Sequence, residues 1–420
     1  MMLAFCQFSP WGGLQRVFGL HPALRAAGAG RAEEAADRGA GEPDRGAGEP
    51  DRADGDDGWR GSVALVLGSA TGGIGQHVAS VARGLLAAGC EVLVCGPAAT
   101  DELFGFSAHG ALFMPVEIPA NPGAQDAGAI RRMRAALASR PLDVVHAHGL
   151  RAGFVVGLAR PGVPLVVTLH NTVMAKGLRG QAGALVERIV ARNAGLVLGA
   201  SEDLVDRARL VGARHARLGA VAAPALARPK RSRAAVRAEF RLRPETPLIL
   251  SVGRLHPQKR YDLLVTASAR WRALTPAPVV VIAGSGPSYM SLAQLASEQH
   301  APFYLLGRRS DVPDLLLGAD LAVITSDWEA RQLFAQEALT SGVPLVATAV
   351  GGLPGLVDDA AVLIPPDDVD ALDRAVRDML ADPRLRADYA ARGPRKAVTW
   401  PTEKDTVDDV RAAYAEVTSR

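Results

Sequence analysis

The chain has 420 residues, 48% of them hydrophobic and 22% charged, and a net charge of +3. The length predicts two or three domains, and the composition is that of a globular protein. No apolar run approaches the roughly 18–20 residues that cross a bilayer. The three cysteines, Cys6, Cys90 and Cys95, have neither the spacing of a structural zinc site nor that of a disulfide framework.

The basic residues do not favour nucleic-acid binding. Arg outnumbers Lys by 42 to 5, and aromatic residues make up only 5% of the chain. The densest basic stretch, 228–243, holds seven basic residues and one acidic residue. We interpret this stretch as a linker and helix with a solvated surface, and we expect no nucleic-acid partner.

Residues 1–58 form a low-complexity extension. The unit DRGAGEP occupies 37–43 and again 44–50, and ten acidic residues and four Arg lie within 31–58. A segment without hydrophobic periodicity cannot bury enough surface to offset the entropy of ordering it. We therefore expect 1–58 to be disordered, and it lacks the continuous apolar core of a signal peptide.

Residues 59–224 are predicted to form an N-terminal domain in which strands and helices alternate. Strands are expected at 63–67, 91–95, 112–118, 144–146, 165–170 and 196–199. Helices are expected near 76–88, 127–139, 151–159, 178–193 and 202–211. Apolar strands that alternate with helices indicate an α/β fold with a doubly wound parallel sheet.

The pattern restarts in a second domain, predicted at 246–397, after a linker and the start of that domain at 225–245. Its strands are expected at 247–252, 278–283, 303–306, 321–324, 344–347 and 361–364. We therefore predict two Rossmann-like domains that face each other across a cleft. Such folds bind ligands at the carboxyl ends of their strands.

A glycine-rich turn, GSATGGIGQH at 68–77, joins the first predicted strand to a helix. Gly72, Gly73 and Gly75 would let backbone amides approach an anion at the helix N-terminus. The turn has no Lys-Ser/Thr signature of a P-loop, and Val78 replaces the third glycine of a dinucleotide site. A tight turn without a ligand remains the alternative.

Three histidines follow or end strands, in DVVHAHG (143–149) and TLHN (168–171). They suggest a metal, but no carboxylate or cysteine stands at ligand spacing, so we expect no metal site. His146 and His170 have the alternative of being buried structural residues. His148 is predicted to lie just past its strand, next to Gly149, and is the better candidate for the cleft.

The second domain carries cations and carboxylates after its strands. Arg254 and Lys259 lie in one loop, and a guanidinium and an ammonium together suit a diphosphate. GSGP at 284–287 is a second possible amide cradle. Glu329 is expected in a loop and Glu337 in the second turn of a helix that begins near Leu333. Two exposed basic residues without a ligand, or a pair of hydrolytic carboxylates, are the alternatives.

Together these motifs resemble the retaining glycosyltransferases of family 4, which have the GT-B fold. The matching pieces over about 62–412 are GGIG, HAHG, TLHN, GRLHPQK, GSGP, VPDLLLGADLAVITSDWE, the two glutamates and GVPLVATAVGG. The resemblance implies transfer of a hexose-type sugar from a GDP- or UDP-sugar without a metal cofactor. It also implies that residues 398–420 cross back as a helix to the N-terminal domain.

The resemblance also implies residue roles. His148, Arg254, Lys259 and Glu329 would act in catalysis. The donor would be bound by Gly72, Gly73, Gly75, Arg254, Lys259, Gly284, Arg308, Glu329, Gln332, Leu333 and Glu337. The acceptor, a lipid, glycan or small metabolite, is not specified, and we expect a cytoplasmic protein with possible peripheral contact at the inner membrane face.

Two positions depart from the family pattern. Arg331 replaces part of a Gly-Phe-Gly-like stretch, and Gly355 stands where the family usually has Glu. A catalytically decayed nucleotide-sugar-binding protein therefore stays open as an alternative. A nucleotide-sugar epimerase or a phosphorylase of the same shape stays open as well.

Overall fold

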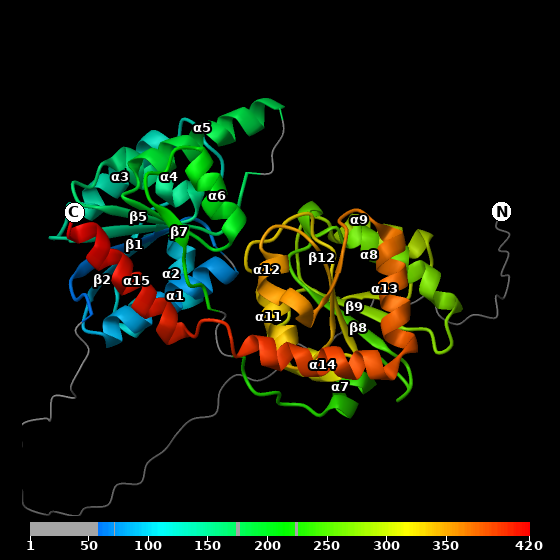
Figure 1. Cartoon of the computed structure of the whole chain (residues 1–420). Helices are drawn as coiled ribbons and strands as arrows, with labels where there is room; N and C mark the ends of the chain where they lie inside the picture. The colour runs from blue at the N-terminus through cyan, green and yellow to red at the C-terminus, as the bar shows by residue number, and fades with distance from the viewer. Residues whose placement is uncertain (1–57, 71, 174–176, 223–225) are drawn as a thin grey trace, which may run out of the picture. The chain divides into compact units, whose positions relative to one another are not determined.

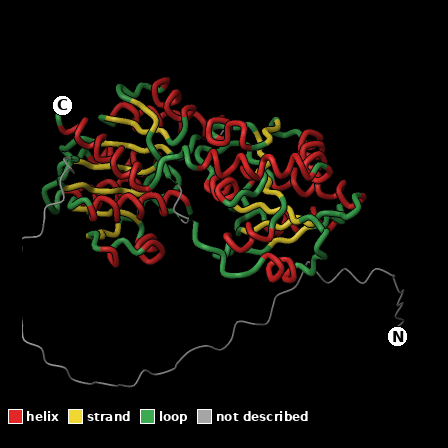
Figure 2. The backbone as a smooth tube through the Cα atoms, turned by 60° about the horizontal axis from the view of Figure 1, so that its bottom comes forward, coloured by secondary structure: helices red, strands yellow, loops and turns green. Residues whose placement is uncertain are grey.

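The computed structural model describes residues 58–70, 72–173, 177–222 and 226–420. Apart from Gly58, the extension expected to be disordered lies outside the described residues. The chain from Gly58 to Arg420 contains two parallel β-sheets, each covered by helices on both faces (Figures 1 and 2). The prediction of two doubly wound α/β domains is confirmed.

The first sheet has seven parallel strands in the order β3-β2-β1-β4-β5-β6-β7. Its strands are β1 (Ser62–Leu67), β2 (Glu91–Gly96), β3 (Leu112–Pro115), β4 (Val144–His148), β5 (Leu165–Leu169), β6 (Leu196–Gly199) and β7 (Ala216–Leu218). Its helices are α1 (Gly73–Ala87), α2 (Ala98–Phe104), α3 (Asp126–Leu137), α4 (Leu150–Ala159), α5 (Gly177–Asn193) and α6 (Glu202–Leu210).

The second sheet has six parallel strands in the order β10-β9-β8-β11-β12-β13. Its strands are β8 (Leu248–Val252), β9 (Val279–Ala283), β10 (Phe303–Leu305), β11 (Leu321–Ile324), β12 (Leu345–Thr348) and β13 (Val362–Ile364). Its helices are α7 (Arg233–Glu239), α8 (Tyr261–Arg270), α9 (Tyr289–Glu298), α10 (Val312–Gly318), α11 (Leu333–Thr340), α12 (Leu353–Val357), α13 (Val369–Ala381) and α14 (Pro383–Ala397).

The strands are mostly apolar because helices bury both faces of each sheet. In β1, Val63 to Leu67 are all fully buried, and β8 buries Leu248 to Leu250 in the same way. Alternate residues of β1 enter two different hydrophobic clusters, one on each side of the sheet. This continuous burial is the physical reason why the strands lack the apolar-polar alternation of a half-exposed sheet.

The C-terminal helix α15 (Glu403–Thr418) packs against α1 and β5 of the first sheet (Figure 1). It begins at a capping box in which Thr402 and Asp405 satisfy each other's backbone amides. Tyr414 on this helix is fully buried, and its ring lies edge-on to Trp59 with 4.9 Å between centroids. Trp400 packs against the hydrophobic core of the second domain, and the helix that follows it packs into the core of the first domain.

The structure differs from the prediction in several elements. Helix α1 begins at Gly73 rather than near residue 76, and β3 ends at Pro115. The edge strand β7 and the helix α2 were not predicted, because neither has a buried apolar run long enough to stand out. Among the described helices, none is long and apolar enough to cross a membrane.

Candidate active site

The loop after β8 carries the two cations predicted to bind a diphosphate. Lys259 ends a short 3-10 helix, Pro257–Lys259, and its Nζ lies 2.5 Å from Oε1 of Glu329. Arg254 is exposed, and its side chain makes no hydrogen bond or ion pair with the part of the chain that the structure describes. The loop therefore presents one cation already paired and one available for an anion.

The Glu329 carboxylate is fixed by three donors. Its Oε1 accepts hydrogen bonds from Lys259 Nζ, from Ser326 Oγ at 2.5 Å and from Gln332 Nε2 at 3.0 Å. The residue is only 6% exposed. Because a buried carboxylate is stable only when it is paired and hydrogen-bonded, this network holds Glu329 in one place.

Main-chain contacts tie the Glu329 loop to the Lys259 loop. Gln258 Nε2 donates to the Trp328 carbonyl at 2.8 Å, and Thr325 Oγ1 donates to the Lys259 carbonyl at 2.9 Å. The Asp327 amide donates to the Gln258 carbonyl at 2.8 Å. The carboxyl ends of β8 and β11 are thereby joined into one surface, as expected for neighbouring parallel strands.

Helix α11 begins at Leu333, as predicted, and its N-terminus follows Gln332 and the Glu329 loop. Gln332 makes no side-chain cap, so the amides of the first turn remain open to an anion. Glu337 lies in the second turn, where burial raises its pKa to about 7. Its carboxyl group has no hydrogen bond within the described residues, so it is free to accept one from a ligand hydroxyl.

Arg331, one of the two departures from the family pattern, is a half-buried cation without partners. Its Nε and Nη2 are buried and make no hydrogen bond in the described structure. Burial lowers the pKa of its guanidinium to about 10. At Gly355, the other departure, a Cβ would meet no atom within 4 Å, so the position opens onto free space.

The first amide of the GSGP turn already has a partner within the chain. The Gly284 amide donates to the Gly307 carbonyl at 2.7 Å, and a Cβ on Gly284 would lie 1.8 Å from the Gly253 carbonyl oxygen. The glycine allows the close packing of two loops. Arg308, next to Gly307, is exposed and has no partner in the described structure.

The three glycines predicted at the first turn have different surroundings. A Cβ on Gly72 would meet no atom within 4 Å, which leaves its backbone approachable. A Cβ on Gly73 would lie 2.9 Å from Leu333 Cδ1, and one on Gly75 would lie 2.1 Å from Phe104 Cε2. Gly75 therefore lets α1 pack closely against Phe104.

The prediction that His148 lies just past its strand is wrong. It is the last residue of β4, pairs in register with Thr168 on β5, and is 2% exposed. Burial among other histidines holds its pKa well below the usual range, so the ring is neutral. In this position its ring neighbours those of His77, His146 and His170.

The alternative interpretation of His146 as a structural residue is confirmed. Its Nδ1 pairs with Tyr414 Oη at 2.8 Å and its Nε2 with Thr168 Oγ1 at 2.7 Å, and the residue is fully buried. His77 on α1, which was not among the predicted site residues, has its ring beside those of His148 and His170. Its position two residues after Gly75 was the only local signal, because the contact joins three separate segments.

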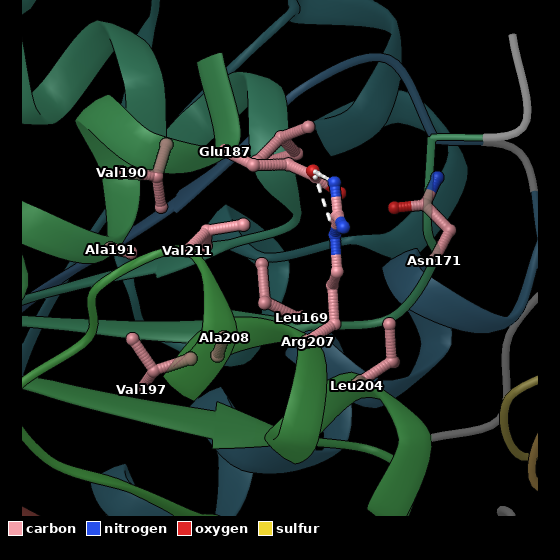
Figure 3. A pocket seen from close by; sticks show the side chains of 11 residues that line it. Leu169, Asn171, Glu187, Val190, Ala191, Val197, Leu204, Arg207, Ala208 and Val211 are labelled. Carbon is pink, nitrogen blue, oxygen red and sulfur yellow. Dashed lines mark hydrogen bonds and ion pairs between the residues drawn. The ribbon is translucent and has the colours of Figure 1, made fainter. Parts of the chain in front are cut away.

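A separate small pocket in the first domain is shown in Figure 3. Its wall is mostly apolar, with Leu169, Val190 and Leu204 among the lining residues. Glu187 and Arg207 also line it, and two hydrogen bonds of 3.0 and 2.6 Å join them. Because each charge neutralises the other, this pocket presents no free ionic group to a substrate.

Comparisons with known proteins assign both domains. The model of the glycosyl transferase 4-like domain matches residues 72–223, and that of glycosyl transferases group 1 matches 232–396. A protein named D-inositol 3-phosphate glycosyltransferase from Salinispora arenicola is 30% identical over 395 residues, 82% of this chain and 87% of the relative. Its namesake from Salinispora tropica is 32% identical over 402 residues, 83% of each chain.

Solved structures share the fold. Sucrose-phosphate synthase from Thermosynechococcus elongatus superposes with a TM-score of 0.71 at 21% identity and covers 86% of this chain and 100% of its own. Anabaena HepE in complex with UDP and glucose gives 0.70 at 18% identity, over 84% and 99%. By its fold, its two domain matches and its relatives, the chain belongs to the family 4 glycosyltransferases, which have the GT-B fold.

Proposed function

We propose that the enzyme moves a hexose from a GDP- or UDP-sugar to an acceptor hydroxyl and keeps the configuration at the anomeric carbon. The observation that carries the proposal is the group at the carboxyl ends of β8 and β11. There Lys259 contacts the buried Glu329, Arg254 is exposed without a partner, and the open N-terminus of α11 follows. Cations and amides of this kind suit a diphosphate that leaves as an anion.

The proposed donor site divides the nucleotide sugar among these residues. Arg254, Lys259 and the first-turn amides of α11 would neutralise the diphosphate, so the donor needs no metal ion there. Glu337 would accept hydrogen bonds from the ribose hydroxyls, since its carboxyl group has no protein partner within the described residues. Glu329 would contact the donor sugar, with Gln332 and Ser326 fixing its orientation.

The proposed reaction is a same-face displacement. The bond from the anomeric carbon to the leaving diphosphate breaks, and a bond to the acceptor oxygen forms on the same face. The acceptor hydroxyl loses its proton to the leaving diphosphate oxygen. Arg254 and Lys259 would stabilise the charge that develops on that diphosphate, which lowers the barrier to departure.

For the acceptor, we propose a small phosphorylated polyol. The support is the name of the relatives, D-inositol 3-phosphate glycosyltransferase, at 30–32% identity over more than four-fifths of this chain. A nucleotide-sugar-binding protein without turnover is the second candidate. Arg331 favours it, because an unpaired, half-buried guanidinium stands within the stretch that is usually Gly-Phe-Gly-like.

The test incubates the enzyme with a panel of UDP- and GDP-sugars, with and without inositol 3-phosphate. Release of the nucleotide measures turnover. We expect one donor to be consumed only when the acceptor is present, and NMR of the product to show the donor's anomeric configuration. Inverted configuration would overturn the retaining mechanism. Tight donor binding without any turnover would favour the second candidate.

Arg254→Ala should lower kcat/KM by at least about tenfold, because a charge-assisted contact to phosphate is worth about 1.5–3 kcal/mol. Arg272→Ala is the matched control: Arg272 is an exposed arginine beyond the far end of α8, and its loss should leave kcat/KM unchanged. Donor binding measured by calorimetry should be the same with and without EDTA. Equal activity of the two variants would remove Arg254 from the site.

A further inference from the structure

Arg331 lies in the loop of the proposed donor site, and its charge has no partner. Its Nε and Nη2 are buried and make no hydrogen bond within the described residues, and its guanidinium forms no ion pair there. Nη1 has no partner either, but it is not buried, so a ligand can reach the guanidinium at this nitrogen. Because the positive charge is shared by all three nitrogens, an anion at Nη1 would neutralise the whole group.

Other buried arginines of the chain have an acidic partner. Arg237 is only 6% exposed, and its Nη1 lies 2.9 Å from a carboxylate oxygen of Asp320. Arg151 in the first domain pairs with Asp126. This is the usual arrangement, because a buried charge without a counter-ion is costly. The unpaired Arg331 departs from it and calls for an anion that the described residues do not supply.

Arg331 remains a cation at neutral pH. Burial lowers the pKa of its guanidinium to about 10, and a group with this pKa is still almost fully protonated at pH 7. The two glutamates of the site do not compensate the charge. Glu329 is paired with Lys259, and burial alone shifts the pKa of Glu337. The compensating anion is therefore expected from a ligand.

The position of Arg331 along the chain places it beside the groups proposed to hold the donor. It stands two residues after Glu329 and two before Leu333, the first residue of α11. Consecutive Cα atoms are about 3.8 Å apart, so its Cα lies within about 7.6 Å of theirs. The 3.0 Å hydrogen bond from Gln332 Nε2 to Glu329 Oε1 closes this stretch into a tight loop. A sugar that contacts Glu329 is therefore within reach of the long Arg331 side chain.

We propose that Arg331 binds an oxyanion of a substrate beside the reacting sugar, so that the enzyme takes an acidic substrate. A guanidinium suits a carboxylate or a phosphate, whose oxygens accept its planar N–H groups. Two substrates can supply the group: a donor sugar whose C6 is oxidised to a carboxylate, which is a hexuronic acid, or the phosphate of the acceptor. The position next to Glu329 favours the donor. The inference rests on the proposed function and names the substrate class of the same site.

Selectivity follows from the unpaired charge. A neutral donor sugar would displace water from the guanidinium and leave it without an anion, at a cost that grows as the local dielectric constant falls. A hexuronate in the same place would replace that cost by a charge-assisted contact. The site should therefore distinguish two donors that differ only in the charge at C6.

The experiment measures binding to the full chain by calorimetry, for donors that differ only at C6: UDP-glucose against UDP-glucuronate, and GDP-mannose against GDP-mannuronate. The wild type should bind one acidic donor about 10–100-fold more tightly than its neutral counterpart, the range for one charge-assisted hydrogen bond. Arg331→Gln, which keeps a polar side chain without the charge, should abolish this preference. Free UDP and GDP carry no sugar, so their unchanged affinity for Arg331→Gln would show that the variant is folded.

A second arm tests the acceptor. Inositol 3-phosphate and inositol are titrated into the chain saturated with UDP or GDP. If the acceptor supplies the oxyanion, Arg331→Gln should weaken binding of inositol 3-phosphate about 10–100-fold, and the paired donors should bind the wild type equally. Either pattern supports the proposal and identifies the source of the oxyanion. Arg272→Gln changes an exposed arginine beyond the far end of α8 and should match the wild type in both arms.

The proposal is overturned if Arg331→Gln binds all four donors and inositol 3-phosphate as the wild type does, or if the wild type prefers the neutral donors. Failure of the wild type to bind UDP or GDP is a different result, because it would contradict the proposed function itself, and the role of Arg331 would fall with it. None of these readouts requires turnover, so a donor-binding protein without catalysis is tested equally well.

Discussion

Lys259 and Glu329 form an ion pair that orders the candidate site. Both side chains are largely buried, and a lone charge at either position would be costly. Their contact keeps both ions in place, and Ser326 and Gln332 add hydrogen bonds to the carboxylate. A diphosphate would then meet an ordered lysine beside an unpaired Arg254.

Glu337 predicts a pH dependence of stability. Burial raises its pKa to about 7 in the folded chain, whereas an unfolded chain keeps the ordinary value of 4.5. Between these two values the folded state binds more protons than the unfolded state, so stability falls as the pH rises through this window. The loss is complete above pH 7 and amounts to about 3 kcal/mol at most.

Urea unfolding at about pH 5 and pH 8 checks this prediction. From about pH 5 to about pH 8, the free energy of unfolding should fall more for the wild type than for Glu337→Gln, in which the side chain cannot ionise. Glu298→Gln, a change at an exposed glutamate of α9, should behave as the wild type does. If the free energy of unfolding depends on pH in the same way for the wild type and for Glu337→Gln, ionisation of Glu337 does not destabilise the fold and the prediction is wrong.

At the scale of elements, close packing of helices explains two glycines of α1. Gly84 on α1 faces α15, where a Cβ would lie 2.2 Å from Val407 Cγ2. Gly75 on the same helix faces Phe104 in the same way. The glycines of α1 therefore serve the helix as packing positions on two sides, in addition to the turn at its start.

Gly84→Ala should destabilise the chain by about 1–3 kcal/mol, because overpacking at α15 outweighs the better helix propensity of alanine, which is about 1 kcal/mol. Gly128→Ala on α3 is the matched control. There a Cβ would meet only the end of the flexible Arg132 side chain at 3.4 Å. The control should be neutral or stabilising by up to about 1 kcal/mol in chemical unfolding. Equal effects of the two changes would contradict the packing argument.

At the scale of the whole chain, α15 completes the first domain although it follows the second in sequence. The helix buries four side chains in the core of the first domain: Val410, Ala413, Tyr414 and Val417. The Tyr414 hydroxyl is hydrogen-bonded to His146 Nδ1. Trp400, just before the helix, packs on the second core and donates to the Leu356 carbonyl at 3.0 Å. The final residues thus connect the two domains a second time.

Removal of residues 401–420 should lower the stability of the first domain by several kcal/mol, since each large buried side chain contributes about 1.5–3 kcal/mol. Calorimetry should show the transition of the first domain at a lower temperature. The transition of the second domain, which is identified because a nucleotide sugar raises its temperature, should stay at the same temperature. Removal of Ser419 and Arg420 alone, which follow the helix, is the control. An unchanged first transition would show that α15 adds little to that core.

The sequence by itself determined the features that depend on neighbours along the chain. Apolar runs separated by helical stretches predicted both sheets, and the start of α11 at Leu333 followed from local pattern. The exposed Arg254 and the second-turn position of Glu337 were predictable for the same reason. These features depend on strand and helix periodicity, which is written in a few adjacent residues.

Only the tertiary structure decided which distant residues meet. It joined Lys259 to Glu329, used the Gly284 amide for a loop contact and buried His148 inside β4. It also brought His77 from α1 to the histidines of two strands, a group that no spacing in the sequence indicates. Such contacts depend on strand order and helix docking, which bring together segments tens to hundreds of residues apart.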